Sequence, residues 1–488
     1  MKKILQREKI FLFFLLTIGS FLRLYRLREL MIYLGDEGRD MLIVRDILRG
    51  VNLPLIGPPT SVGQLFLGPA YYYLITPFVW LFKMDPIGPA VFISLLGIFT
   101  IFLVYWVGRD FFDLPTAIFS AALYTVSPVV VEFSRSSWNP NPMPFFVLLL
   151  MLGLFYWQKK KRARYLYLAA LSFGIMLQLH YLAILMTPFL IFAVYRLRNC
   201  FKNKKEPLLA LAIVLLLISP LLIFDLRHDF FNLRGFWQIL GERSGEGFSL
   251  FDLLSRGRDR IRQLFSLFLG FQEREGKNNL AILILAVFSL FHWKREKKIS
   301  RLVIYGWFLW GLLALGFYRH SVYPHYLTFL FPFPALLLGR LLGYFFGQGS
   351  VRKGLVLLVF SFLLLAMTSL TWKSLRREPS LNVDLVEKVA TLVVNQSRGQ
   401  AFNFALLAEN NYDSSYRYFF ELWQTPVVYE QEVTGQLFVV CEDEKSCQPE
   451  GNSKWEIALF DAAYEGEIKK AGCWQPDPLV QVFKFVPK

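Results

Sequence analysis

Residues 86–112, PIGPAVFISLLGIFTIFLVYWVGRDFF, contain an apolar run that lasts from 86 to 108 and ends directly before Arg109 and Asp110. About 20 apolar residues are enough for a helix to cross the hydrocarbon core of a bilayer. Together with this run, the chain contains apolar runs at 9–27, 114–134, 142–158, 165–180, 181–196, 207–225, 279–293, 300–318, 326–345 and 354–372. We therefore expect an all-α polytopic membrane domain with about eleven transmembrane helices.

The composition agrees with a membrane protein and excludes a nucleic-acid-binding one. Of the 488 residues, 55% are hydrophobic and only 18% are charged, and the mean hydropathy is +0.41. The net charge of +16 is unevenly placed, because residues 1–372 carry +21 and residues 373–488 carry −5. The basic residues thus lie between apolar runs and not on a soluble face that nucleic acid would contact.

Lysine and arginine gather in alternate connections between the apolar runs, and such residues favour the cytoplasmic side. The basic connections are 109–113, 159–164 (KKKRAR), 196–206, 294–301 and 346–353. The N-terminus carries Lys2 and Lys3 and is placed inside by the same rule. Its first run has no small-residue cleavage site and is expected to stay as an anchor in the cell membrane. The loops 28–69 and 226–278 and the tail from 373 are then extracytoplasmic.

The segment AYYYLITPFVWLF, 70–82, has the composition of a span but is short and contains Pro77. If it crossed the bilayer, the KKKRAR connection would lie outside, against the positive-inside rule. We expect an interfacial or re-entrant helix, and a short ordinary span is the alternative.

Residues 373–488 alternate helical and strand patterns and predict a small α/β domain beside the transmembrane domain of residues 1–372. Helices are expected in NVDLVEKVATLVVNQS and SSYRYFFELW, and strands in AFNFALLAE, QLFVVCED, WEIALFD and LVQVFKF. No Gly-rich phosphate loop is present. On an oxidising outer side, Cys441 and Cys447 are expected to form a bridge. The alternative is that Cys441, Cys447 and Cys473 are all free thiols.

The first outer loop holds the strongest candidate for chemistry. Its sequence LGDEGRDMLIVRDIL, 34–48, puts Asp36 and Glu37 at the start of an amphipathic helix. Acidic residues at a helix N-terminus are common caps, which is the ordinary explanation. A carboxylate pair beside Arg39 at the outer membrane boundary can also accept a proton from an incoming hydroxyl, which makes these residues catalytic candidates.

Further polar side chains at the outer ends of apolar runs are candidates for substrate binding. They are Tyr71, Tyr72, Arg135, Asn139, His180, Tyr181, Arg319, His325 and Tyr326, and Arg39 beside the carboxylate pair is a further substrate-binding candidate. Arginine and histidine suit phosphate oxygens, and polar groups at membrane depth are often functional. Each also has a structural explanation: tyrosine prefers the interface, arginine extends to headgroups, and histidine bonds between helices. The spacing matches no metal motif.

The order of these clusters resembles the C-type membrane glycosyltransferases of the protein O-mannosyltransferase and aminoarabinose transferase group, glycosyltransferase family 39 and relatives. In that group an Asp-Glu pair opens the first outer loop, like Asp36 and Glu37 with Arg39 just beyond. A Pro-x-Tyr-Tyr segment follows, like GPAYYYL at 68–74, and then a Gly-Arg inner turn, like GRDFF at 108–112.

Two later features complete the resemblance, which covers residues 1–345 clearly and the tail only in size and placement. Ser-Pro and Ser-Arg steps match Ser127-Pro128 and Ser134-Arg135, and a late His-Tyr-Leu before proline matches 325–327 and Pro332. The chain departs from the family where Leu67-Gly68-Pro69 replaces the frequent His or Lys before Pro-Pro, and where Asn139 and Asn141 replace an Asp. The departures put the donor sugar and the acceptor in doubt.

The resemblance implies a cell-membrane enzyme that moves a hexosyl or pentosyl group, with inversion, from a polyprenyl-phosphate donor to a protein, lipid or glycan acceptor outside. Asp36 is then the base, Glu37 positions it, and Arg135, Arg319 and His325 face the leaving phosphate. No cofactor is required, although a divalent cation at Asp36 and Glu37 is compatible with some relatives. The rival predictions are a secondary transporter or lipid flippase, and a polysaccharide polymerase or ligase.

Overall fold

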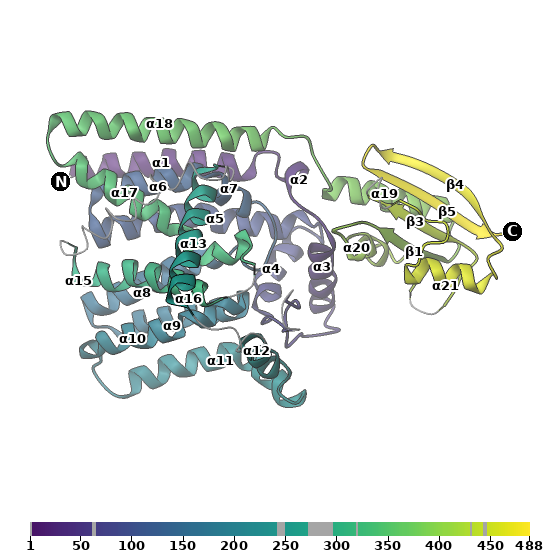
Figure 1. Cartoon of the computed structure of the whole chain (residues 1–488), viewed down its shortest axis with the longest axis horizontal. Helices are drawn as coiled ribbons and strands as arrows, with labels where there is room; N and C mark the ends of the chain where they lie inside the picture. The colour runs from purple at the N-terminus through teal and green to yellow at the C-terminus, as the bar shows by residue number, and fades with distance from the viewer. Residues whose placement is uncertain are drawn as a thin grey trace. The chain divides into compact units, whose positions relative to one another are not determined.

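The computed structural model describes residues 2–60, 65–241, 249–271, 296–318, 321–429, 432–442 and 447–488. The chain is mostly helical, with one small sheet near its C-terminus, and it forms two compact units (Figure 1). Unit 1 comprises residues 1–25, 54–75 and 89–377, and unit 2 comprises residues 26–53, 76–88 and 378–488. The sequence predicted a catalytic transmembrane domain of residues 1–372 and an extracytoplasmic domain of residues 373–488. These two roles remain predictions.

Unit 1 is built from helices and short helical turns. The helices are α1 (Lys2–Leu24), the first part of α4 (Ala70–Leu81), α5 (Ile87–Val107), α6 (Leu114–Val126), α7 (Pro128–Phe133), α8 (Met143–Lys160), α9 (Ala163–Leu179), α10 (Thr187–Arg196), α11 (Lys205–Arg227), α12 (Phe231–Gly241), α13 (Leu250–Leu269), α15 (Lys298–Ser300), α16 (Gly306–Phe317), α17 (Pro332–Phe346) and α18 (Ser350–Leu375). The turns are η1 (Gly108–Phe112), η2 (Tyr181–Met186), η3 (Arg198–Cys200), η5 (Arg301–Tyr305) and η6 (Pro324–Leu330).

Four helices among the described residues are long and apolar enough to cross a membrane, and a fifth is added if η6 and α17 count as one bent span. The four cover Ile87–Phe112, Lys205–Arg227, Lys298–Phe317 and Ser350–Leu375. The expected count of about eleven therefore remains a prediction. The expected run at 279–293 lies outside the described residues.

Prolines break several of the apolar runs that we expected to be continuous. The run 114–134 divides between α6 and α7 where Pro128 follows Ser127, and Pro188 lies near the start of α10 after the 3₁₀ turn η2. The helices η6 and α17 meet at Pro332 with a bend of 51°. Proline lacks an N–H and collides with the preceding turn, so an apolar run that contains it is seldom one straight helix.

Small residues let helices of unit 1 approach closely. At Gly339 of α17 an added Cβ would lie 2.6 Å from the backbone nitrogen of Ser120 on α6, and at Gly343 it would lie 2.8 Å from that of Thr116. Glycine at these positions allows backbone-to-backbone contact, which is typical of helix pairs in membranes.

Unit 2 contains a five-stranded mixed sheet in the order β2-β1-β3-β5-β4. Its elements are α2 (Leu27–Leu30), α3 (Gly35–Leu48), α19 (Val383–Ser397), β1 (Phe402–Leu407), α20 (Ser414–Leu422), β2 (Val427–Val428), β3 (Leu437–Cys441), α21 (Trp455–Ala463), β4 (Ile468–Asp477) and β5 (Val480–Pro487). β1 is parallel to β2 and β3, whereas β5 is antiparallel to β3 and β4. Cys441 and Cys447 form a disulfide.

Most of the tail's predicted elements are confirmed, and one is wrong. The helices α19 and α20 and the strands β1, β3 and β5 lie where their patterns predicted them. WEIALFD, expected as a strand, is the helix α21, because Ile457 and Phe460 are its buried residues and lie three apart, as on one face of a helix. The strands β2 and β4 were not predicted.

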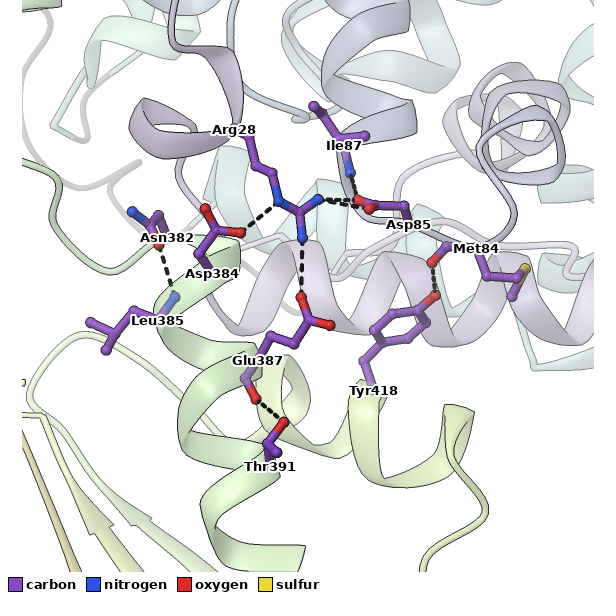
Figure 2. Close-up of polar contacts among 10 residues, drawn as sticks. All are labelled: Arg28, Met84, Asp85, Ile87, Asn382, Asp384, Leu385, Glu387, Thr391 and Tyr418. Atoms are coloured by element: carbon purple, nitrogen blue, oxygen red, sulfur yellow. Dashed lines mark hydrogen bonds and ion pairs between the residues drawn. The ribbon is translucent and has the colours of Figure 1, made fainter. Parts of the chain in front are cut away.

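Segments from far apart in the chain are joined in unit 2 by an arginine with three carboxylate partners. Arg28 pairs with Asp85 at 2.6 Å, with Asp384 at 2.5 Å and with Glu387 at 3.0 Å (Figure 2). The hydroxyl of Tyr418 on α20 donates to the Met84 carbonyl in the same region. Residues 26–53 and 76–88 are therefore bound to the C-terminal α/β fold within one unit.

Candidate functional site

The N-terminus of α3 separates the roles of Asp36 and Glu37. The backbone N–H of Leu34 donates to Glu37 Oε2 at 2.9 Å, so the glutamate caps the helix that it helps to start. Glu37 is 8% exposed, whereas 45% of the Asp36 side chain is accessible. The ordinary explanation of a capping acid thus describes Glu37 and leaves Asp36 open to a substrate.

Two donors hold one oxygen of Asp36. Its Oδ1 accepts from Arg39 Nη1 at 2.7 Å and from the hydroxyl of Tyr412. Arg39 also reaches Asp40 Oδ1 through Nη2 at 2.7 Å. Asp36 Oδ2 has no hydrogen-bond partner within the described part of the chain, so this oxygen remains available to accept a proton.

Burial changes the acidity of the groups around Asp36. Burial raises the pKa of Glu37 to about 8. Burial also raises the pKa of Asp40 to about 6, although the charge and hydrogen bonds of Arg39 act against it. The pKa of the Tyr412 hydroxyl is raised, first by burial and further by its bond to Asp36, so that it remains a hydrogen-bond donor at neutral pH.

The structure adds three residues that the sequence analysis missed. Asp40 is 1% exposed, and its Oδ2 is buried without a hydrogen-bond partner in the described residues. Tyr412 donates to Asp36, and Asn411 accepts from the Gly35 N–H at 2.8 Å. Asp40 was detectable because it lies four residues after Asp36, on the same helical face. Nothing local to Asp36 pointed to residues more than 370 positions away.

Asp36 and Glu37 are not arranged to share one divalent cation. Arg39 lies between Asp36 and Asp40 and bonds to both, and Glu37 is turned to the Leu34 N–H. A cation bridging Asp36 and Glu37 would have to displace the arginine and the helix cap. Across the described ranges, no group of three His, Cys, Asp or Glu residues converges as metal ligands.

In unit 1 the structure brings four of the predicted binding residues together. His180 stacks on Tyr181 with ring centroids 4.9 Å apart and meets Tyr326 at 5.0 Å. His325 lies edge-on to Tyr326 at 4.4 Å. The hydroxyl of Tyr181 shares a 2.7 Å hydrogen bond with that of Tyr318, a residue that the sequence analysis did not select. Aromatic faces and hydroxyls of this kind suit a sugar or a polar headgroup.

Two other predicted binding residues of unit 1 donate hydrogen bonds to backbone carbonyls. Arg135 donates from Nη1 to the Leu22 carbonyl at 2.9 Å and from Nη2 to the Tyr25 carbonyl at 2.7 Å, at the C-terminal end of α1. Asn139 Nδ2 donates to the Leu179 carbonyl at 2.7 Å, directly before His180. These bonds satisfy helix-end carbonyls, which is a structural role in its own right.

Two of the three tyrosines at the start of α4 are buried, and Tyr73 is exposed. Tyr71 shares a 2.7 Å hydrogen bond with Ser137, and Tyr72 is also buried. The N–H of Gly68 donates to the Gln178 carbonyl at 3.1 Å, so the Gly-Pro step is attached near the end of α9. Arg319 lies outside the described residues.

The comparisons with known proteins agree on the fold. A family model described as dolichyl-phosphate-mannose-protein mannosyltransferase matches residues 67–224. The archaeal oligosaccharyltransferase AglB from Archaeoglobus fulgidus, solved with an inhibitory peptide and a dolichol-phosphate, aligns with a TM-score of 0.55 and 12% identity over 96% of this chain and 74% of its own. The fold is that of the C-type membrane glycosyltransferases. The resemblance stated from the sequence is confirmed.

A second structure of this C-type fold matches nearly end to end. ArnT from Cupriavidus metallidurans, bound to undecaprenyl phosphate, aligns with a TM-score of 0.52 and 12% identity over 98% of both chains. No curated protein matches the sequence. At identities this low, the structural alignments establish only the fold. The activity and the substrate must be argued from the residues.

Proposed function

We propose that this protein is a membrane glycosyltransferase that moves a sugar from a polyprenyl-phosphate donor to an acceptor on the outer face of the cell membrane, with inversion at the anomeric carbon. The observation that carries the proposal is the Asp36 carboxylate, which is accessible, bonded at one oxygen by Arg39 and Tyr412, and open at the other. The fold adds support, because AglB and ArnT were solved with dolichol-phosphate and undecaprenyl phosphate.

In the proposed reaction Asp36 Oδ2 takes the proton of the acceptor hydroxyl as the hydroxyl oxygen attacks the anomeric carbon. The bond between that carbon and the lipid phosphate breaks, and the electron pair leaves with the phosphate. Arg39 and Tyr412 keep the carboxylate oriented, which general base catalysis requires. Glu37 acts indirectly, by starting the helix that carries Asp36.

The donor is assigned to residues of unit 1. His180, Tyr181, His325 and Tyr326 form the aromatic group proposed to contact the sugar or its phosphate. Supporting roles are proposed for Tyr71, Tyr72, Arg135, Asn139 and Arg319. Arg135 already bonds two carbonyls, so a phosphate would have to share its guanidinium with them.

The proposal includes the membrane arrangement predicted from the sequence, with about eleven spans, an interfacial α4, a cytoplasmic N-terminus and the α/β fold outside. Donor sugars of the hexosyl or pentosyl class and protein, lipid or glycan acceptors all fit an open carboxylate of this kind.

The decisive experiment supplies purified protein in vesicles with a panel of polyprenyl-phosphate sugars and measures free polyprenyl phosphate. A transferase releases the lipid phosphate in amounts that rise with added acceptor, and Asp36→Asn removes this release. A transporter or flippase instead moves intact donor between leaflets, which a leaflet-selective reagent detects. Intact donor crossing the membrane without any release would overturn the proposal.

The polymerase or ligase alternative shares the lipid-linked substrate, so the product must be examined. Mass spectrometry of the acceptor distinguishes one added sugar from a ladder of repeat units. A single addition for each acceptor site is expected from the proposed enzyme, and a ladder would favour the alternative.

A further inference from the structure

The helices α8, α10 and α16, together with α15 and the π-helical turn η5, line an open cavity of about 490 Å³ in unit 1. Three basic side chains line it: Arg196 at the end of α10, Lys298 at the start of α15 and Arg301 at the start of η5. A π-helical turn is rare and is frequently found at functional sites.

The three cations lack acidic partners. Among the described residues, none of them forms an ion pair or donates a side-chain hydrogen bond to a carboxylate. Neighbouring basic residues behave differently, since Arg340 pairs with Asp113 and Glu296 at 2.6 Å each and Lys297 bonds the Asp110 carbonyl at 3.0 Å. The cavity therefore holds concentrated positive charge that the described fold leaves uncompensated.

Apolar side chains make up most of the remaining wall of the cavity. Phe189, Leu197 and Ile299 line it and are buried, and Phe192 lines it while remaining 52% exposed. Ile191 beside it on α10 is also exposed. A positively charged cavity that continues into exposed apolar surface matches an amphiphile, with an anionic head and hydrocarbon chains, better than a soluble anion.

We propose that this cavity binds the phosphate headgroup of an anionic phospholipid, with its acyl chains along the exposed apolar face of α10. Basic pockets between membrane helices on the cytoplasmic side are suited to such headgroups. Arg196 and Leu197 begin the connection 196–206, and Lys298 and Arg301 belong to the connection 294–301. Both connections are among the basic ones predicted to be cytoplasmic. The positive-inside rule explains exposed lysines in these connections, but it does not explain three unpaired cations around one apolar cavity. The inference stands independently of the proposed enzyme activity.

The test compares lipid binding by purified full-length protein and two matched variants. The pocket variant combines Arg196→Gln, Lys298→Gln and Arg301→Gln, and the control combines Lys202→Gln, Lys204→Gln and Lys205→Gln, three exposed lysines in the connection before α11 and at its start. Native mass spectrometry counts phosphatidylglycerol retained during titration against phosphatidylcholine. Each basic residue near an anionic headgroup contributes roughly fivefold in affinity, so the pocket variant should bind at least about tenfold more weakly. The control should stay within about twofold.

Three further measurements keep the result decisive. Lys298→Gln alone, a change of one exposed side chain, should weaken phosphatidylglycerol binding by about fivefold, even if the triple variant is unstable. Inorganic phosphate at millimolar concentration should neither displace the lipid nor raise the unfolding temperature. The lipid itself should raise that temperature in the wild type and in the control. Equal phosphatidylglycerol retention by pocket variant and control, or stabilisation by phosphate alone, would overturn the proposal.

Discussion

At the scale of single residues, burial distinguishes the three carboxyls on the first turns of α3. Asp36 is accessible and bonded at one oxygen, Glu37 is buried and caps the helix, and Asp40 is buried against Arg39. A group that accepts a proton from a substrate must be reachable, whereas a buried carboxyl holds its proton more tightly. We therefore propose Asp36 as the base, and this proposal makes the following predictions.

Asp36→Asn keeps the size of the side chain and removes its basicity. Turnover should fall by about 10²- to 10⁴-fold, because general base catalysis contributes that much, while donor binding and expression remain near wild type. The release of polyprenyl phosphate measures turnover. Glu37→Gln should lose far less, since its amide oxygen still accepts from Leu34. A strong loss in Glu37→Gln with normal turnover in Asp36→Asn would reverse the two roles.

Tyr412→Phe removes one donor to Asp36 and one acceptor for Arg39, but keeps the bonds of Arg39 to Asp36 and Asp40. A hydrogen bond to a charged group is worth roughly 1.5–3 kcal/mol, so kcat should fall roughly ten- to a hundredfold with little change in KM for the donor. Tyr464→Phe is the matched control, because the Tyr464 hydroxyl donates to the Thr434 carbonyl in the same unit. An equal loss of kcat in both variants would mean that Tyr412 acts only on stability.

The pH dependence of stability tests the burial of Glu37. Its pKa rises from 4.5 to about 8 on folding, so its contribution is fully present below about pH 4.5 and is lost as the pH rises through 8. The unfolding temperature of the wild type should therefore fall between pH 5 and pH 8.5 more steeply than that of Glu37→Gln. Parallel curves for the two proteins would contradict a buried, protonated Glu37.

At the scale of elements, α3 is placed by its contact with α20 and by the chain before α20. An added Cβ at Gly38 would lie 2.4 Å from the backbone of Ser414, and one at Gly35 would lie 2.6 Å from the ring of Tyr412. Arg45 on α3 also pairs with Glu421 on α20 at 2.6 Å. These contacts bring Tyr412 to Asp36, because a larger residue at either glycine would push the two elements apart.

Gly38→Ala should loosen α3. The methyl group has no room beside the Ser414 backbone, and overpacking of this kind costs about 1–3 kcal/mol. Faster hydrogen exchange over residues 35–48 would report the loss. Gly257→Ala on α13 is the control, because nothing lies within 4 Å of its added Cβ, and alanine should stabilise that helix slightly. Unchanged exchange in Gly38→Ala would show that α3 does not depend on this contact.

At the scale of the whole molecule, the charge asymmetry predicts the orientation in the membrane. Net charge is +21 over residues 1–372 and −5 over residues 373–488, and the lysines gather in alternate connections. Because basic loops are retained in the cytoplasm, the α/β fold should lie outside. Cys473 is free and exposed, whereas Cys200 is free and buried. The thiol of Cys473 can therefore report on which side of the membrane the α/β fold lies.

A membrane-impermeant maleimide should label wild-type protein in intact cells, and Cys473→Ser should abolish the labelling. In that background Lys160→Cys should react only after the membrane is permeabilised, because KKKRAR is predicted to be cytoplasmic. Labelling of Lys160→Cys in intact cells would reverse the orientation and turn α4 into a full span.

Local patterns in the sequence were sufficient for the membrane class, the mixed α/β tail and the helix that begins near Asp36, because helical and strand periods are set by neighbouring residues. Only the tertiary structure decided which carboxyl is accessible, that Tyr412 and Asn411 meet α3, that Arg135 bonds carbonyls of α1, and that WEIALFD is a helix. The physical reason is distance along the chain. Burial and hydrogen bonds between residues hundreds of positions apart leave no trace in the sequence around either partner.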